Sequence, residues 1–183
     1  MPQNVMTAAV TGLTTMRDGP RPQTRHILPQ RQLDQLPSPA IMEELVARSM
    51  EIPLVRFQQS RMASDGSCAL CLSDHIAGGP SEAFIDAHEF CHIHPLPESG
   101  IHLTLPRDLR DEVSRLGWGE PHPISLTGIM SGLMSIYLPR DAGELEIVLY
   151  LISQSCRFAQ GRFAPATLSN PSSRHLGRQS RDE

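Results

Sequence analysis

Two short segments near the middle of the chain alternate between apolar and polar residues, which is typical of strands with one covered face. The first spans residues 90–94, and prolines end it. The second spans residues 100–105, where aliphatic side chains alternate with His102 and Thr104. Every second residue of a strand points to the same face. The pattern therefore predicts two neighbouring strands that carry histidines on one face and aliphatic side chains on the other.

Three other segments repeat apolar residues at helical spacing. Ser38 and Pro39 are a favoured cap and a favoured first residue, and they predict a helix that ends near Met50. A second helix is predicted over residues 106–117, where a proline opens it and a glycine closes it. A third is predicted over residues 140–157, with its apolar side chains on one face.

The remaining patterned segments predict strands at residues 52–57, 67–72 and 133–138 and a short helix that begins at Ser81. Strands and helices mixed in this order, with short connections between neighbouring strands, are typical of the α+β class. We therefore expect a mainly antiparallel sheet backed by helices.

The distribution of apolar residues predicts a single domain at residues 19–160. Within it, residues 19–39 contain five prolines and predict an extended arm. Residues 1–18 and 161–183 offer too little apolar surface to offset the entropy of ordering. We expect both of these segments to be disordered tails.

Composition and charge exclude several classes of function. The net charge of -4 gives no basic face for nucleic acid. All 16 basic residues are arginine, so Schiff-base chemistry on lysine is excluded. No stretch approaches the ~20 apolar residues of a membrane span, and the first residues lack the apolar core of a secretory signal. We expect a cytoplasmic protein with no transmembrane segment.

Cys68 and Cys71 form a CxxC pair that has no second pair to complete a zinc site. The surrounding residues alternate as in a strand, and free cysteine behaves as a small apolar side chain. The pair is therefore predicted to lie in a buried strand.

Four histidines, His92, His94, His102 and His122, lie close together in the sequence, and Glu89 precedes them. Imidazole is the side chain best suited to binding a metal or moving protons near neutral pH. In adjacent antiparallel strands, His92 and His94 share a face and His102 can lie opposite them. We expect a site here, with these three as possible ligands of a divalent metal ion; a site without metal is an equal alternative.

Three other interpretations use the same residues. Residues 88–92 satisfy the HExxH motif of zinc peptidases, but that motif acts on a helix, and Pro95 ends this segment too early. His92-x-His94 followed by Glu98 is similar to the first motif of cupins, although the second cupin motif is missing. The third interpretation is that the histidines are ordinary hydrogen-bonded residues.

Several motifs resemble the fungal luciferase family and its non-luminous relatives in both order and spacing. They are Glu89-x-x-His92-x-His94, His102-Leu103, Gly117-Trp118-Gly119-x-x-His122-Pro123 and Tyr137-Leu138-Pro139-Arg140, the last followed by an acidic helix. The arm, with Arg21-Pro22, His26 and Gln30-Arg31-Gln32, resembles a stretch that precedes the catalytic part of those enzymes. The likeness covers about residues 19–158.

The resemblance implies an oxygen-using enzyme. Fungal luciferases add molecular oxygen to 3-hydroxyhispidin, an enolic styryl-pyrone, without a flavin or nicotinamide in that step. For this chain it implies an oxygenase that acts on a small enolic or phenolic metabolite, with molecular oxygen as co-substrate. His92, His94 and His102 are the expected catalytic residues, and Glu89 is expected to orient one imidazole.

Four further residues are expected to bind the substrate: Trp118, His122, Tyr137 and Arg140. Two of them also have a purely structural alternative. Trp118 follows a glycine that ends a helix and can seal the core. Arg140 can pair with Asp141 or Glu144 at the start of the last helix.

Two departures from the luminous members lead us to expect a non-luminous relative. The loop at residues 95–100 differs from theirs, and no hydrophobic N-terminal anchor is evident. Two alternative functions would use the same histidines. One is a metal-dependent hydrolase, lyase or isomerase, and the other is a non-catalytic protein that binds a small molecule.

Overall fold

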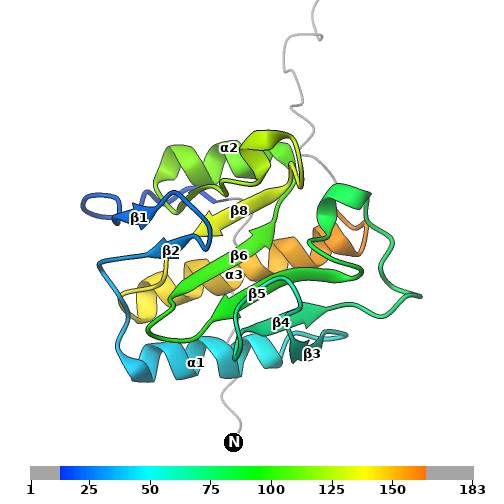
Figure 1. Ribbon diagram of the computed structural model, residues 1–183, viewed down its shortest axis with the longest axis horizontal. Helices are drawn as coiled ribbons and strands as arrows, with labels where there is room; N and C mark the ends of the chain where they lie inside the picture. Colours follow the sequence, from blue (N-terminus) through cyan, green and yellow to red (C-terminus); the bar gives the residue numbers. More distant parts are fainter. Residues whose placement is uncertain (1–12, 164–183) are drawn as a thin grey trace, which may run out of the picture.

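The computed structural model describes residues 13–163, which form a six-stranded sheet with helices against one face (Figure 1). The strand order is β3-β4-β5-β6-β8-β7, and every neighbouring pair is antiparallel. The strands are β3 (Arg56–Gln59), β4 (Cys68–Cys71), β5 (Glu89–His94), β6 (Gly100–Thr104), β7 (Gly119–Pro121) and β8 (Leu133–Ile136). The predicted α+β class with a mainly antiparallel sheet is confirmed.

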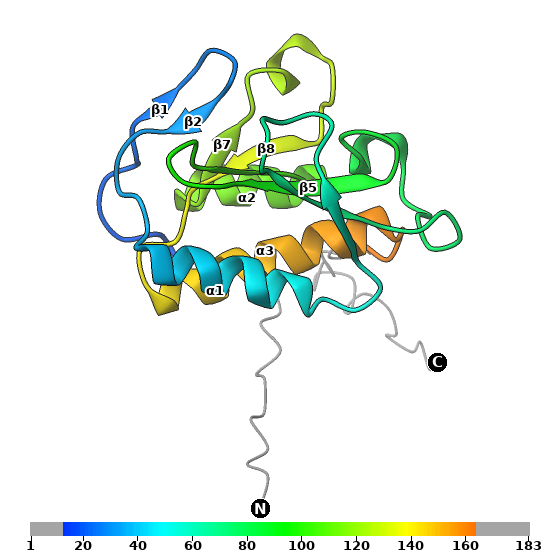
Figure 2. The ribbon, with the colours of Figure 1, turned by 60° about the horizontal axis from the view of Figure 1, so that its bottom comes forward.

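Three α-helices accompany the sheet: α1 (Pro39–Met50), α2 (Arg107–Leu116) and α3 (Ala142–Ala159). Helices α1 and α3 lie side by side across one face of the sheet, while α2 packs beside β7 (Figures 1 and 2). Two short 3-10 helices, η1 (Ser81–Ala83) and η2 (Ser125–Thr127), interrupt the connections. One face of the sheet is therefore closed by helices, and loops cover the other.

The helix signals in the sequence act as predicted. The Ser38 hydroxyl accepts a hydrogen bond from the Ile41 backbone N–H at 3.3 Å and caps α1. Gly117, at φ 78°, ends α2 in a left-handed conformation that glycine adopts without strain. Helix α3 begins slightly later than predicted, because Asp141 is its cap and accepts from the Glu144 backbone N–H at 2.9 Å.

The strand predicted at residues 52–57 is displaced, since β3 begins only at Arg56. The backbone turns after α1, where the Ile52 N–H bonds to the Ser49 carbonyl. Leu54 then has φ 69°, which lies outside the range of a strand. The other predicted strands agree with β4, β5, β6 and β8 to within two residues at each end.

The hydrophobic core fills the layer between the sheet and the helices (Figure 2). From the sheet it takes Leu70, Cys91, Ile93, Ile101 and Leu103, and from α3 it takes Leu145, Val148, Leu151, Ile152 and Cys156. The aliphatic positions of the two central strands thus face the helices, as their alternation predicts. The other face of the same strands is left for polar residues.

The proline-rich arm forms a small hairpin of β1 (Thr24–Arg25) and β2 (Arg31–Gln32). Its second strand is tied to the domain because the Gln32 side-chain oxygen accepts from the Leu138 backbone N–H at 2.8 Å. The Gln32 backbone N–H also donates to the Ser99 carbonyl at 3.0 Å. In place of the simple extended arm expected from its prolines, a folded hairpin lies over the open face of the sheet (Figure 2).

Residues 13–18, which the sequence assigned to a tail, pack against the domain. Leu13 is buried in the core, and the Arg17 backbone N–H donates to the Leu116 carbonyl at 2.9 Å. The Trp118 indole N–H donates to the Thr15 carbonyl at 2.6 Å. The tails were predicted at residues 1–18 and 161–183, and of these residues 1–12 and 164–183 lie outside the described residues.

The four cysteines are free thiols, and three of them are buried. Cys68 and Cys71 are the first and last residues of β4, which confirms the predicted buried strand. Across residues 13–163, none of the helices is long and apolar enough to span a bilayer.

Candidate active site

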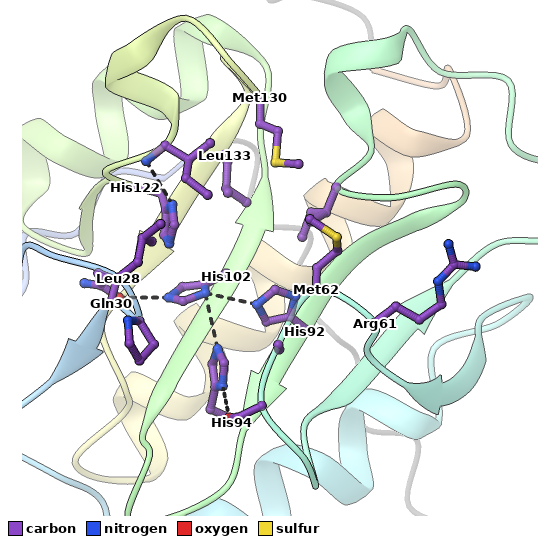
Figure 3. Close-up of a pocket in the computed structure, with 15 residues that line it drawn as sticks. Leu28, Gln30, Arg61, Met62, His92, His94, His102, His122, Met130 and Leu133 are labelled. Carbon is purple, nitrogen blue, oxygen red and sulfur yellow. Dashed lines mark hydrogen bonds between the residues drawn. The ribbon is translucent and has the colours of Figure 1, made fainter.

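Strands β5 and β6 place three histidines on the face of the sheet that the helices do not cover. His92 lies directly opposite His102 in the antiparallel register, and His94 lies opposite Gly100. Gly100 lies against both rings, since a Cβ there would be in ordinary van der Waals contact with His94 and His102, at 3.5 Å from each. The predicted convergence of imidazoles from adjacent strands is thus observed (Figure 3).

A β-bulge brings Glu89 to the same face. Cys71 pairs with Glu89 while its neighbour Leu70 pairs with Cys91, so Phe90 is an extra residue in β5. Without it, Glu89 would share the helix-covered face with Cys91, because strand residues alternate. The bulge moves the carboxylate to within 2.6 Å of His92 Nδ1.

Each of the three rings points one nitrogen toward a common centre, and we call these the inner nitrogens (His92 Nε2, His94 Nε2 and His102 Nδ1). His102 Nδ1 lies 3.0 Å from His92 Nε2 and 3.3 Å from His94 Nε2. One ring nitrogen from each histidine falls within 4.8 Å of the others. All three side chains are buried, with exposed fractions of 3–5%. The structure therefore builds one compact cluster, which we call the histidine centre (His92, His94 and His102).

Each ring of the histidine centre has a partner for its outer nitrogen. His92 Nδ1 bonds to Glu89, which also accepts from the Ser60 hydroxyl at 2.9 Å. His94 Nδ1 lies 3.0 Å from the Ser67 hydroxyl. His102 Nε2 bonds to the side-chain oxygen of Gln30 at 2.8 Å. These contacts hold the rings with their inner nitrogens toward one another.

His122 follows β7 and stacks edge-on against the histidine centre. Its ring centroid lies 4.5 Å from that of His102. The Ile124 backbone N–H donates to His122 Nδ1 at 3.3 Å. A neutral His122 ring therefore carries its proton on Nε2, where it can donate to a bound molecule.

A cavity of about 460 Å³ adjoins these four histidines. This volume falls within the range of small-molecule sites, roughly 300–1,000 Å³. Apart from the histidines, its walls are mostly apolar and come from Leu28 and Pro29 of the arm, Met62 and Ala63, Ile85, Ile124 and Met130, and Leu133 at the start of β8. The exposed fractions of Leu28 and Met62 are 56% and 46%, so these two side chains form an apolar mouth of the cavity. The arrangement suits a small, largely apolar molecule with a few polar atoms.

Burial keeps several of these imidazoles neutral near pH 7. Burial, together with a smaller electrostatic contribution from His92, lowers the pKa of His94 to about 4. Burial likewise lowers the pKa of His122 to about 4. The pKa of His102 falls well below its ordinary value for the same reason, with added repulsion from His92, His122 and His94. Neutral rings offer lone pairs to a proton or a cation.

Three residues that the sequence assigned to substrate binding lie away from the cavity. Trp118 is buried in the core and bonds to the Thr15 carbonyl. The Tyr137 hydroxyl donates to Glu120 at 3.3 Å. Arg140 pairs with Glu144 and donates to the Asp18 carbonyl at 2.8 Å, which is the structural alternative considered for it. Of the four expected binding residues, only His122 lines the cavity.

Gln30 is the residue that sequence reasoning missed. It lies 72 positions from His102 in the chain and reaches the histidine centre through the β1–β2 hairpin. The only signal for it was the Gln30-Arg31-Gln32 run within the arm. The apolar wall residues carried no motif at all, because their role depends on which loops meet over the sheet.

The peptidase and cupin interpretations are wrong. His88, Glu89 and His92 lie on or beside a strand, so the one-turn spacing that HExxH requires on a helix is lost. The His88 ring instead pairs with Asp74 at 3.2 Å, outside the cavity. The described sheet is open, with helices on one face, whereas a cupin needs a double-stranded barrel.

Comparison with known proteins agrees with the motifs. Residues 87–155 match the family model of the luciferase domain. A luciferase of Armillaria gallica is 29% identical over 155 residues, covering 76% of this chain and 58% of the relative. A luciferase of Armillaria mellea is 28% identical over 169 residues, covering 84% and 64%. One of Armillaria ostoyae is 29% identical over 155 residues, covering 76% and 58%.

The chain thus spans about six tenths of the length of these curated relatives. No solved structure matches it. The matched region runs from the start of β5 into α3 and contains the three residues of the histidine centre together with Glu89 and His122. The resemblance predicted from the motifs is confirmed: residues 87–155 match the luciferase-domain model, and most of the chain is similar to luciferases of Armillaria.

Proposed function

We propose that this protein is an oxygenase that acts on a small enolic or phenolic molecule bound in the cavity beside the histidine centre. The observation that carries the proposal is the meeting of three buried imidazoles at the wall of an apolar cavity of about 460 Å³. Titratable groups clustered in a pocket are a general mark of function. The likeness to proteins named luciferase supports the oxygen chemistry.

The first chemical step assigned to the site is loss of the enolic proton. The inner nitrogens of the histidine centre form a pocket for one positive charge, and Glu89 behind His92 balances that charge. A substrate hydroxyl facing this point would pass its proton to one of these inner nitrogens and become an enolate, and the positive charge so formed lowers the free energy of the adjacent anion. The apolar walls exclude water, which strengthens this electrostatic effect.

The second step is addition of oxygen. The electron-rich enolate carbon forms a C–O bond to molecular oxygen, which is thereby reduced to a peroxide anion on the substrate. The Nε2–H of His122 can donate a hydrogen bond to the developing anion, since its Nδ1 is occupied by the Ile124 backbone N–H. The enolate supplies both electrons that reduce oxygen to the peroxide level, so no external reductant is needed, and the proton removed in the first step neutralises the peroxide.

Oxygen uptake by the purified protein tests this proposal. We expect consumption of oxygen with 3-hydroxyhispidin or with a member of a panel of enolic pyrones and polyphenols. His122→Ala should reduce the rate by about 100-fold, which is typical of losing one donor to an oxyanion. His75→Ala is the matched control, because His75 is exposed and belongs to neither the cavity nor the histidine centre.

Two other outcomes would reject the proposal in favour of the alternative functions. Product formed without oxygen uptake would indicate a hydrolase, lyase or isomerase. Tight binding of a panel member with no turnover would indicate a binding protein.

A further inference from the structure

The hydrogen bonds around the histidine centre determine which ring nitrogens of His92 and His102 carry protons, and they permit the matching arrangement at His94. The Gln30 side-chain amide nitrogen donates to Glu120 Oε1 at 3.2 Å. A carboxylate accepts only, so the other end of the amide, its oxygen, must face His102. His102 Nε2 is therefore the donor in their 2.8 Å bond, and a neutral His102 has a bare lone pair on Nδ1.

The same reasoning applies to the other two rings. Glu89 accepts from both the Ser60 hydroxyl and His92 Nδ1, which leaves the lone pair of a neutral His92 on Nε2. The Ser67 hydroxyl lies 3.0 Å from His94 Nδ1 and can accept its proton, in which case the His94 lone pair is on Nε2. All three lone pairs then point at one another with no proton between neutral rings. Such an arrangement is repulsive unless a cation lies at the centre.

Two of the three separations between the inner nitrogens match those of ligands on one metal ion, and the third, between His92 Nε2 and His94 Nε2, is within 4.8 Å. Metal–nitrogen bonds of about 2.1 Å place neighbouring ligands about 3.0 Å apart in octahedral geometry and about 3.4 Å apart in tetrahedral geometry. The observed separations from His102 Nδ1 are 3.0 Å to His92 and 3.3 Å to His94. Little movement of the rings is therefore required for coordination.

We propose that the histidine centre binds one divalent transition-metal ion, through His92 Nε2, His94 Nε2 and His102 Nδ1. Three imidazoles with no oxygen ligand favour zinc, copper, iron, nickel or cobalt over magnesium or calcium. The outer contacts to Glu89, Ser67 and Gln30 are the kind that orient histidine ligands and raise their basicity. Because three ligands leave a coordination position free, the ion can bind a substrate oxygen from the cavity.

This inference rests on the proposed function and deepens it, since the metal would take the place of the proton as the positive charge beside the enolate, and the enolic proton would pass to solvent through the mouth of the cavity. It also gives the β1–β2 hairpin a role. Gln30 holds His102, and Gln30 is in turn held by Glu120 of β7. Removing the Gln30 amide should weaken metal binding although Gln30 is not itself a ligand.

Titration of chelator-treated protein with Co²⁺ and with Zn²⁺ tests the site. We expect one ion per chain with micromolar or tighter affinity, and visible absorption bands typical of Co²⁺ bound by nitrogen. His94→Ala should abolish saturable binding, and His75→Ala should leave it unchanged. Glu89→Gln and Gln30→Ala should weaken binding by about 10–100-fold, the usual effect of removing a partner of a ligand. Urea unfolding of each variant verifies that it is folded.

The metal proposal is overturned if folded wild-type protein shows no saturable binding of either ion, or if His94→Ala binds as wild type does. Its failure can be separated from failure of the proposed function. Chelator-treated protein that binds no metal and still consumes oxygen would reject the metal and retain the oxygenase. Metal binding without any oxygen uptake would retain the metal site and reject the oxygenase.

Discussion

The two faces of β5 and β6 share one backbone but carry different side chains and have different roles. On one face Cys91, Ile93, Ile101 and Leu103 are packed under α3 in the hydrophobic core. On the other face His92, His94 and His102 meet beside the cavity. Neighbouring residues of one strand thus serve stability and chemistry separately. A rigid packed sheet is a precise support for a site, because strand residues are held by the ladder on both sides.

The coverings of the two faces differ as well. Helices close the aliphatic face and bury it completely (Figure 2). The histidine face is closed by the β1–β2 hairpin and by loops, whose side chains leave the cavity between them (Figure 3). Loops tolerate an opening to solvent that a packed helix does not. The site therefore lies where the sheet lacks a helical cover.

Leu103→Ala is the most damaging change that we expect from the comparison. Leu103 has an exposed fraction of 0% within the core. Its truncation should lower the free energy of unfolding by about 2–5 kcal/mol, through lost burial and the cavity that remains. Urea denaturation measures the loss. An effect under about 1 kcal/mol would contradict the role assigned to the aliphatic face.

His94→Ala should separate activity from stability. Oxygen uptake should fall by at least about 100-fold, as is usual when a group that handles charge in the reaction is lost. Unfolding should stay cooperative, because the helix-packed face is untouched. A variant that unfolds or aggregates would instead show that His94 is structural.

Two buried cysteines test whether burial raises the pKa of a thiol similarly on both faces. Cys71 lies on the histidine face of β4 and Cys156 lies on α3, yet burial raises the pKa of Cys71 to about 12 and that of Cys156 to about 11. In the unfolded chain these thiols ionise near their ordinary pKa of 9.0. The unfolded state therefore holds fewer protons above that pH, and stability falls as pH rises.

The expected loss at pH 10 is about 1 kcal/mol for each buried thiol. Urea denaturation of wild type, Cys71→Ala and Cys156→Ala at neutral pH and at pH 10 measures it. Each variant should lose less stability between the two pH values than wild type does. If only one of the two variants changes the pH dependence of the free energy of unfolding, the two faces differ in burial.

Ser135→Ala is the mildest change and sharpens the comparison within the histidine face. Ser135 lies opposite His102 in the β6–β8 register, and its buried hydroxyl has no hydrogen-bond partner among the described residues. Removing an unpaired hydroxyl should leave the free energy of unfolding unchanged or raise it by up to about 1 kcal/mol. A clear loss of stability would show that this hydroxyl has a partner.

Much of the fold was predictable because its signals are local. The cap at Ser38, the left-handed glycine at position 117 and the alternation in β5 and β6 each depend on a few adjacent residues. The strand expected at residues 52–57 was misplaced, since the chain needs a turn after α1 that apolar content does not reveal. Residues 13–18 carry no local signal of order, because their contacts are with distant segments.

The sequence by itself determined that His92 and His94 share a face and that His102 can meet them, because the two-residue period of a strand dictates side-chain direction. Only the tertiary structure decided the rest. The bulge at Phe90 turned Glu89 toward His92, and the hairpin brought Gln30 to His102. Packing at the start of α3 directed Arg140 to Glu144 rather than to the cavity. These outcomes depend on contacts between residues far apart in the chain, which no local pattern encodes.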